Sequence, residues 1–450
     1  MLYTVDTDSP ISVKEQILMD KFEKGFFIGA ATAAHQVEGS NIHSDYWLQE
    51  QMPHSSFNEP SGEACDHYHR YEEDIRLLAQ AGLNAYRFSV EWARIEPEEG
   101  KFDPAEIEHY RNVIRCCKAN GVEPIVTLLH FTSPAWLIRK GGWEAESTIE
   151  YFRRYASYVT EQLGSELRCI CTINEANMGL QLAAIAKRFR MMAEQAAKAQ
   201  AGNAKEAEGT VQVGMNFEKM MENMKYAAAE NAQAFGTPQP QIFVNSRTPE
   251  GDALVFRAHQ AAKEAIKALY PDIKVGITLS LHDLQALPGG EKFAGAAWEE
   301  EFSHYLPYIR DDDFLGVQNY TRTQYGPSGQ LPAPEGAELT QMDYEFYPEA
   351  LEHVLRKVHE DFKGDLIVTE NGIATADDAR RVEFIRRALA GVQNCIADGI
   401  PVKGYFHWSL MDNFEWQKGF SMQFGLIAVD RTTQTRYPKP SLTCLGSYRG

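Results

Sequence analysis

The sequence feature that most constrains the fold is an alternation of two kinds of segment between residues 26 and 407. Short, uninterrupted runs of apolar and β-branched residues are separated by longer amphipathic stretches. Runs that are apolar throughout are typical of parallel strands buried on both faces, whereas half-exposed strands alternate with polar residues. Eight such runs are predicted to be strands: 26–33, 83–89, 123–129, 167–173, 273–279, 314–318, 366–369 and 402–407.

The amphipathic stretches predict helices, and Gly82 and Gly121 stand where two of them should end. Eight strands alternating with helices predict an α/β fold, a single (β/α)8 TIM barrel over residues 1–450, with its active site at the carboxyl ends of the strands. A doubly wound sheet is the alternative, but the first predicted strand carries only Gly29 where that fold usually has a Gly-rich phosphate loop. The predicted helices are 71–81, 105–119, 147–163, 253–269, 348–362 and 377–397.

Residues 180–240 interrupt this repeat. The segment is rich in Ala, Glu, Lys, Gln and Met, a composition that favours helix, and seven of the chain's 13 Met lie between Met178 and Met224. We expect a helical, Met-rich insertion after the fourth strand. It is interpreted either as a surface hairpin in which Met fills space or as a lid over the open face of the barrel, since Met adapts to varied apolar partners.

The chain is strongly acidic, because 44 Lys and Arg stand against 63 Asp and Glu and give a formal net charge of −19. Such a chain repels phosphate backbones and anionic lipid head groups, so neither nucleic acid nor a membrane is expected as a partner. Aromatic residues make up 11% of the chain, which suits stacking on flat ligands. A neutral or cationic partner is easier to accept, and a homo-oligomer is left open.

Cysteine usage and the N-terminal residues indicate the compartment. The seven Cys include no Cys-x-x-Cys pair of the metal-binding kind, the first twenty residues have no apolar signal-peptide core, and no apolar run approaches the roughly 20 residues of a membrane span. We expect reduced thiols and a cytoplasmic protein. His67 and His69 suggest a metal site, but no third ligand is evident, so neither a metal nor a cofactor is expected.

Two carboxylates stand where barrel enzymes place their chemistry. Residues 172–177 read TINEAN after the fourth predicted strand, and residues 368–372 read VTENG after the seventh. Each of Glu175 and Glu370, taken singly, is more often an ordinary strand-end acid that caps a helix or pairs with Arg. As a pair they would oppose each other across the barrel mouth. Two opposed carboxyl groups, one protonated and one ionised, can hydrolyse a glycosidic bond, with retention of configuration at a separation of about 5–5.5 Å.

Three long motifs carry a resemblance to a known family. Residues 27–39 read FIGAATAAHQVEG, residues 86–95 read YRFSVEWARI, and residues 408–416 read WSLMDNFEW. With these motifs the chain resembles glycoside hydrolase family 1, the β-glucosidase/β-galactosidase type, from about residue 26 to residue 440 and least between 180 and 241. The resemblance implies a retaining exo-β-glycosidase that acts on β-glucosides and also on β-galactosides or β-fucosides.

The resemblance also implies roles for individual residues. Glu175 would be the general acid/base and Glu370 the nucleophile, with Arg87 and Tyr320 holding Glu370 ionised. The charge of Glu370 should raise the pKa of Glu175 and keep it protonated. In isolation His130 and Trp408 are more often core residues, but their matched motifs favour sugar binding. The residues expected to bind the sugar are Gln36, His130, Asn174, Trp408, Glu415, Trp416 and Phe424.

Alternatives within and outside the family stay open. A transglycosylating or specialised aryl-β-glucosidase is one, and a non-catalytic sugar-binding barrel is another, although such barrels usually lose one catalytic Glu. A phospho-β-glycosidase is disfavoured, because Glu415 would repel a sugar phosphate and Lys418 alone does not compensate.

The chain departs from the usual family pattern in places that bear on substrate range. Ala176 follows Glu175 where Pro is common, so we expect a less constrained backbone and a less rigid Glu175. In the third-strand motif only His130 is kept and Leu129, Phe131 and Thr132 differ, and in the sixth-strand motif Tyr320 is kept and Gln318 and Asn319 differ. The last departure is at Met422 and Gln423, where basic residues are common.

Overall fold

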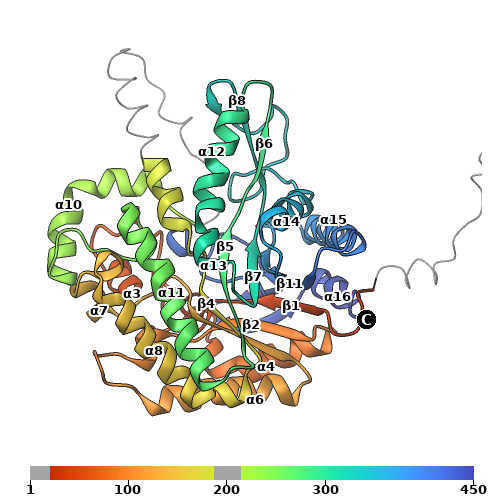
Figure 1. Ribbon diagram of the computed structural model, residues 1–450. Coiled ribbons are helices and arrows are strands. Elements are labelled where there is room, and N and C mark those ends of the chain that lie inside the picture. Colours follow the sequence, from red (N-terminus) through yellow and green to blue (C-terminus); the bar gives the residue numbers. More distant parts are fainter. Residues whose placement is uncertain (1–20, 187–213) are drawn as a thin grey trace, which may run out of the picture.

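The centre of the molecule is a closed barrel of parallel strands (Figure 1). The computed structural model describes residues 21–186 and 214–450. All eight predicted strands are confirmed, with ends that differ from the prediction by a few residues. The barrel strands are β1 (Phe27–Ala31), β2 (Ala85–Ser89), β3 (Glu123–Leu129), β4 (Cys169–Ile173), β5 (Lys274–Ser280), β7 (Phe314–Gln318), β10 (Asp365–Asn371) and β11 (Val402–Trp408).

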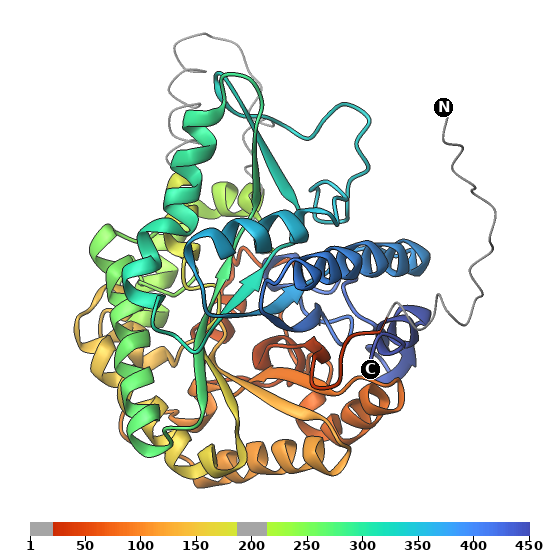
Figure 2. The same cartoon turned by 45° about the vertical axis from the view of Figure 1, so that its right-hand side comes forward.

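The strands pair in the order β1-β11-β10-β7-β5-β4-β3-β2. Every residue of β2, β4 and β7 is buried, because one face lines the barrel interior and the other packs under the surrounding helices (Figure 2). This burial on both faces explains why the strands read as apolar throughout rather than as alternating. The predicted TIM barrel is therefore confirmed.

The predicted helices surround the barrel. In α6 the side chain of Asp103 accepts a hydrogen bond from the Ala105 N–H, Pro104 takes the first turn, and an apolar stripe faces inward. The observed helices are α4 (His67–Gln80), α6 (Pro104–Ala119), α8 (Ser147–Leu163), α11 (Pro249–Leu269), α14 (Ala350–Asp361) and α15 (Asp378–Ala397).

An extension that the sequence did not predict projects beyond the barrel (Figures 1 and 2). It begins at the carboxyl ends of β5 and β7, where the chain enters a small sheet and a further helix. The extension comprises β6 (Asp283–Ala286), β8 (Arg322–Gly326), β9 (Gly329–Gln330) and α12 (Glu291–Glu301).

The insertion after β4 is helical in the part that the structure describes. After β4 and a turn at residues 174–177, one helix runs through 178–186, and α10 (Phe217–Phe235) follows after the undescribed residues 187–213. α10 packs against α3 (Asp45–Glu50) and α7 (Ala135–Arg139), and the exposed Met221 and Met224 project from it. Met191 and Met192 lie outside the described residues, so the lid stays a prediction.

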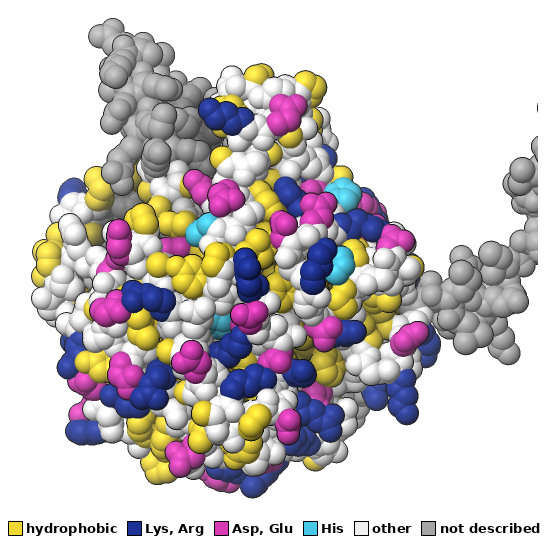
Figure 3. Space-filling view, viewed as in Figure 1, with side chains coloured by type: hydrophobic (Ala, Val, Ile, Leu, Met, Phe, Trp, Pro, Cys, Tyr) yellow, Lys and Arg dark blue, Asp and Glu magenta, His cyan; other side chains and the backbone are white. Residues whose placement is uncertain are grey.

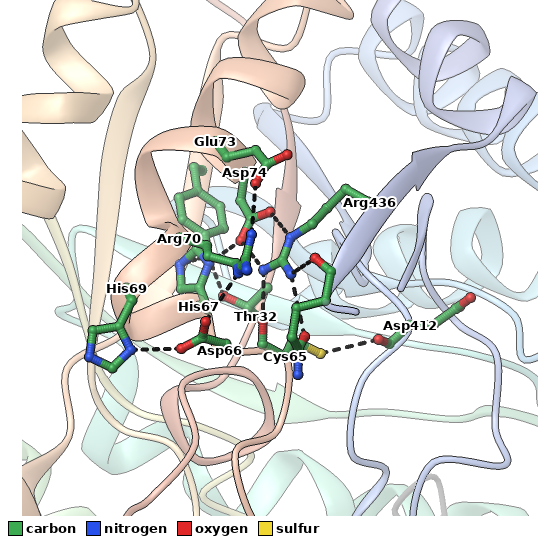
Figure 4. A network of polar contacts seen from close by, with 12 residues as sticks. Thr32, Cys65, Asp66, His67, His69, Arg70, Glu73, Asp74, Asp412 and Arg436 are labelled. Atoms are coloured by element: carbon green, nitrogen blue, oxygen red, sulfur yellow. Dashed lines mark hydrogen bonds and ion pairs between the residues drawn. The ribbon is translucent and has the colours of Figure 1, made fainter. Parts of the chain in front are cut away.

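A buried polar network joins α4 to the C-terminal strand β13 (Thr435–Pro438), as Figure 4 shows. Asp74 accepts two hydrogen bonds from Arg436, at 2.7 and 2.9 Å, and lies 2.7 Å from Nδ1 of His67. The other His67 nitrogen lies 3.1 Å from the Tyr86 hydroxyl, whereas His69 is exposed beside Asp66. His67 thus belongs to a structural network, and the described residues contain no cluster of side chains suited to hold a metal ion.

The surface mixes charges of both signs. On the face in Figure 3, acidic and basic side chains are interspersed. In the described parts of the chain, every helix is too short or too polar to cross a membrane.

Candidate active site

Glu370 lies near the end of β10, and both of its carboxylate oxygens accept strong hydrogen bonds. Arg87 Nη1 donates to Oε1 at 2.6 Å, and the Tyr320 hydroxyl donates to Oε2 at 2.7 Å. All three side chains are buried. Burial raises the pKa of Glu370, while the Arg87 charge and the Tyr320 hydrogen bond oppose that rise. The ionised form of Glu370 is therefore the one that its neighbours favour.

Glu175 follows Asn174 after the end of β4, and its carboxyl group has fewer hydrogen-bond partners than that of Glu370. Its Oε2 is buried and has no hydrogen-bond partner among the described residues. Burial raises the pKa of Glu175 well above its ordinary range, and the negative charge of Glu370 raises it further. The two carboxyl groups thus differ in proton affinity, which suits one to hold a proton and the other to stay ionised.

Asn174 connects several strands at the barrel mouth. Its Oδ1 accepts from Arg87 Nη2 at 2.5 Å and from Gln318 Nε2 at 3.0 Å, and its Nδ2 lies 3.2 Å from His130 Nε2. Burial, and then the Arg87 charge, lowers the pKa of His130 well below its ordinary range. His130 is therefore a neutral imidazole that can accept from Asn174.

A second buried group surrounds Glu415, in the loop after β11. Gln36 of α2 (Ala34–Val37) donates to the Phe414 carbonyl at 2.7 Å, and its Nε2 lies 3.4 Å from Glu415 Oε2. Glu415 Oε1 accepts from the Gly214 N–H at 3.1 Å. Burial raises the pKa of Glu415 to about 8, although the Gly214 hydrogen bond lowers it.

Aromatic rings form a wall beside these polar groups. The His130 ring stacks with Trp408 at 5.5 Å between ring centroids and with Trp416 at 6.1 Å. Phe424 contacts Tyr320 edge-on at 6.0 Å. Flat apolar rings beside hydrogen-bonding groups suit a ligand with an apolar face and polar edges, such as a sugar.

Several buried polar atoms in this region lack partners among the described residues. They include Gln36 Oε1, His130 Nδ1, Glu175 Oε2 and the Tyr344 hydroxyl. Buried polar atoms are normally hydrogen-bonded. Such a set beside the two acids leaves donors and acceptors that a polar ligand or water can satisfy.

The structure brings the predicted residues into two groups. Arg87, Glu370, Tyr320, Asn174 and His130 are joined by hydrogen bonds, with Phe424 against Tyr320. Gln36 and Glu415 form the other group, and the Trp408 and Trp416 rings lie beside His130.

Several residues of the site were not predicted from the sequence. Thr278 and Gln318 are polar residues at or near the ends of β5 and β7, and the strand-end rule that identified Glu175 could have found them. Tyr344 comes from a long loop without a local pattern. Burial raises its pKa well above the ordinary range, and the negative charges of Glu415 and Glu175 raise it further.

Comparison with known proteins decides the family. The family model for glycosyl hydrolase family 1 matches residues 18–204 and 302–447, most of the chain. The chain belongs to glycosyl hydrolase family 1. Among solved structures, the β-glycosidase BGL167 is 45% identical, with 95% of this chain and 96% of that chain covered and a TM-score of 0.83.

Two named relatives cover nearly the whole of this family 1 chain. The thermostable β-glucosidase B of Thermobispora bispora is 30% identical over 93% of this chain and 89% of its own length. The bifunctional β-D-glucosidase/β-D-fucosidase of Bifidobacterium breve is 29% identical over 93% of this chain and 96% of its own length. The chain is accordingly a glycoside hydrolase of the β-glucosidase type.

One expectation about this family 1 chain is wrong. We expected Ala176, in place of Pro, to leave the backbone beside Glu175 less constrained. Instead the Ala176 N–H donates to the Thr278 carbonyl at 3.1 Å, a bond that Pro could not make. The Ala176 carbonyl also accepts from Arg247 Nη2 at 2.8 Å. Both polar groups of the residue after Glu175 are therefore held.

Proposed function

We propose that the protein is a retaining exo-β-glycosidase that removes terminal β-D-glucosyl residues and also accepts β-D-galactosyl and β-D-fucosyl residues. The observation that supports this most is the asymmetry of the two acids. Glu370 is paired with Arg87 and Tyr320, whereas the buried Oε2 of Glu175 has no hydrogen-bond partner in the parts of the chain that the structure describes.

In the first half of the reaction, a carboxylate oxygen of Glu370 attacks the anomeric carbon and forms a glycosyl ester. The bond from that carbon to the leaving oxygen breaks, and Glu175 gives its proton to this oxygen. Arg87 and Tyr320 keep the nucleophile ionised and oriented until the attack.

In the second half, Glu175 acts as a base. Esterification removes the charge of Glu370, which is one cause of the raised pKa of Glu175. Glu175 can then ionise, take a proton from water and direct the resulting hydroxide to the anomeric carbon. The ester bond breaks, Glu370 regains its charge, and the sugar leaves with its original configuration.

The sugar would lie between the polar groups and the aromatic wall. We propose that Gln36, His130, Asn174 and Glu415 bind its hydroxyl groups, while Trp408, Trp416 and Phe424 contact its apolar parts. A phosphorylated sugar is not proposed, because Glu415 offers a phosphate no positive charge and repels it whenever the carboxyl group is ionised. The name of the Bifidobacterium relative supports fucosides as substrates beside glucosides. None of these steps calls on a cofactor, and a cytoplasmic location and a homo-oligomer stay predictions.

Substitution of the nucleophile tests the proposal. Glu370→Gly should lower the hydrolysis of a nitrophenyl β-glucoside by on the order of 10⁴-fold or more, because the attacking oxygen is lost. Azide should occupy the space and restore turnover, and the product should be the α-glucosyl azide by NMR. The wild-type enzyme should release β-glucose first.

A matched control is Glu360→Gly, which removes an exposed glutamate of α14 and should keep the wild-type rate. Undiminished hydrolysis by Glu370→Gly would exclude Glu370 as the nucleophile. A β-configured azide product would exclude direct attack by azide on the substrate.

A further inference from the structure

The backbone around Glu175 is held in an unfavourable conformation. Glu175 has a φ of 44°, in the left-handed region, which costs a residue with a side chain about 1–3 kcal/mol. The Glu175 N–H donates to Thr278 Oγ1 at 3.0 Å. Glu175 Oε2 has no hydrogen-bond partner among the described residues, so no such bond fixes this oxygen, and the backbone sets the point and direction from which the side chain leaves.

Arg247 is the charged side chain that contacts this backbone. It lies just before α11 and donates from Nη2 to the Ala176 carbonyl at 2.8 Å, although the two residues are 71 positions apart. The Ala176 carbonyl belongs to the peptide group next after that of Glu175. Displacement of this carbonyl would therefore rotate the backbone that orients the acid.

The environment of Arg247 does not resemble that of an ordinary structural ion pair. The side chain is buried, and its Nε and Nη1 have no hydrogen-bond partner in the described parts of the chain. Asp252 is 3.9 Å from Nε and accepts from the Tyr305 hydroxyl instead. The face of the Phe243 ring lies 4.7 Å from the guanidinium carbon. A buried cation with so few partners contributes little to stability.

Gly179 makes room for the guanidinium group. A Cβ atom at this position would lie 1.9 Å from Arg247 Nε and 2.7 Å from Nη2. The Arg247 N–H also donates to the Gly179 carbonyl at 3.3 Å. The Arg247 guanidinium therefore occupies the space that the missing side chain of Gly179 leaves open, four residues after Glu175.

We propose that Arg247 is a positioning residue for Glu175: through the Ala176 carbonyl it holds the acid/base in the direction that proton transfer to the leaving oxygen requires. This inference rests on the proposed role of Glu175. It assigns to Arg247 and Gly179 a part in general acid catalysis, although neither touches the substrate.

Leaving groups of different basicity test the inference. A phenolate needs a proton as it departs, whereas a dinitrophenolate departs without one. We expect Arg247→Met to lower kcat/KM for phenyl β-glucoside by roughly 10–100-fold, a part of the 10²–10⁴-fold that general acid catalysis supplies. The loss for dinitrophenyl β-glucoside should be at most about threefold. kcat/KM is the right quantity, because it reports the glycosylation step alone.

Two further variants separate positioning from folding. Gly179→Ala should also lower kcat/KM more for phenyl than for dinitrophenyl β-glucoside, because its methyl group displaces the Arg247 guanidinium. If Arg247→Met does not fold, the result for Gly179→Ala tests the inference alone. Arg436→Met is the matched control, since it removes a buried arginine far along the chain that pairs with Asp74 (Figure 4). It should lower Tm and affect both substrates equally.

The result that would overturn the inference is an equal loss on both substrates, or no loss, in folded Arg247→Met and Gly179→Ala. Glu175→Gln distinguishes failure of the inference about Arg247 from failure of the proposed function. It should lower kcat/KM for phenyl β-glucoside far more than for dinitrophenyl β-glucoside, and by a larger factor than Arg247→Met. If Glu175→Gln affects both substrates equally, the acid role of Glu175 itself is wrong, and the inference falls with it.

Discussion

At the scale of single residues, the proton affinities of Glu175 and Glu370 depend on the hydrogen-bond donors that reach each carboxyl group. Glu370 receives one donor on each oxygen, whereas Glu175 Oε2 receives none from the described residues. Both acids are buried, so burial alone cannot assign their roles. The donors make the difference, and their removal should be visible in the pH profile.

Tyr320→Phe tests this reading. The change removes a hydrogen bond that favours the ionised form of Glu370, so the pKa of Glu370 should rise. The acid limb of the kcat/KM profile should move to higher pH by about one to two units, since a hydrogen bond to a charged group contributes about 1.5–3 kcal/mol. The measurement is kcat/KM against pH for a nitrophenyl β-glucoside.

Tyr155→Phe is the matched control, because its buried hydroxyl donates to the Leu128 carbonyl. Its acid limb should coincide with that of the wild type. If the limb of Tyr320→Phe also coincides with the wild type, Tyr320 does not set the ionisation of Glu370.

At the scale of elements, the insertion contacts the group of residues around Glu415, to which we assign sugar binding. Gly214 precedes α10, its N–H donates to Glu415 Oε1, and its carbonyl accepts from the Gln417 N–H at 2.9 Å. Replacement of the whole insertion would therefore disturb sugar binding as well as any lid. A single substitution at Gly214 is the sharper experiment.

Gly214→Ala should weaken sugar binding. The added Cβ would lie 2.6 Å from the Glu415 carbonyl oxygen and 2.9 Å from its Cγ, so the Glu415 loop must shift. We expect KM for β-glucosides to rise about tenfold, the equivalent of one lost hydrogen bond of about 1.4 kcal/mol, with a smaller change in kcat. Gly295→Ala in α12, where a Cβ meets open space, should leave KM unchanged. An unchanged KM in Gly214→Ala would show that this contact does not support Glu415.

At the scale of the whole molecule, the buried network of Figure 4 fixes the C-terminal strand to α4. Burial raises the pKa of Asp74, but the hydrogen bonds from Arg436 and His67 outweigh it and hold the pKa below its ordinary value. A lowered pKa in the folded state means that the ionised Asp74 stabilises the fold above the unfolded pKa near 3.9. This contribution is lost as the pH falls through the folded pKa.

Asp74→Asn should destabilise the protein without changing its chemistry. It leaves Arg436 buried without its counter-ion, at a cost of about 3–5 kcal/mol, which should lower Tm by roughly 5 °C at pH 7. The difference from the wild type should shrink below about pH 4. Glu73→Gln, which removes an exposed ion pair with Arg70, should keep the wild-type Tm. Equal Tm values for Asp74→Asn and the wild type at pH 7 would contradict this assignment.

The barrel could be predicted from the sequence because its strands are apolar on both faces, as in β2 and β4, and its helices carry caps such as Asp103. The extension could not, because short strands such as β6 depend on pairing with distant segments rather than on their own pattern. In the site, Glu175, Glu370 and Arg87 lie in motifs, whereas Arg247 becomes relevant only when folding brings it to Ala176.

The hydrogen bonds of Arg87 also bear on how inactive relatives of this chain should be recognised. Its guanidinium is buried and bonds to both Glu370 and Asn174. In a lineage that loses the Glu370 carboxylate, the positive charge of Arg87 remains buried without its partner. This unpaired charge favours a second substitution, at Arg87. A pseudoenzyme that has long drifted from hydrolysis should therefore have lost both partners. A homologue that has lost only the carboxylate marks a recent or damaging substitution.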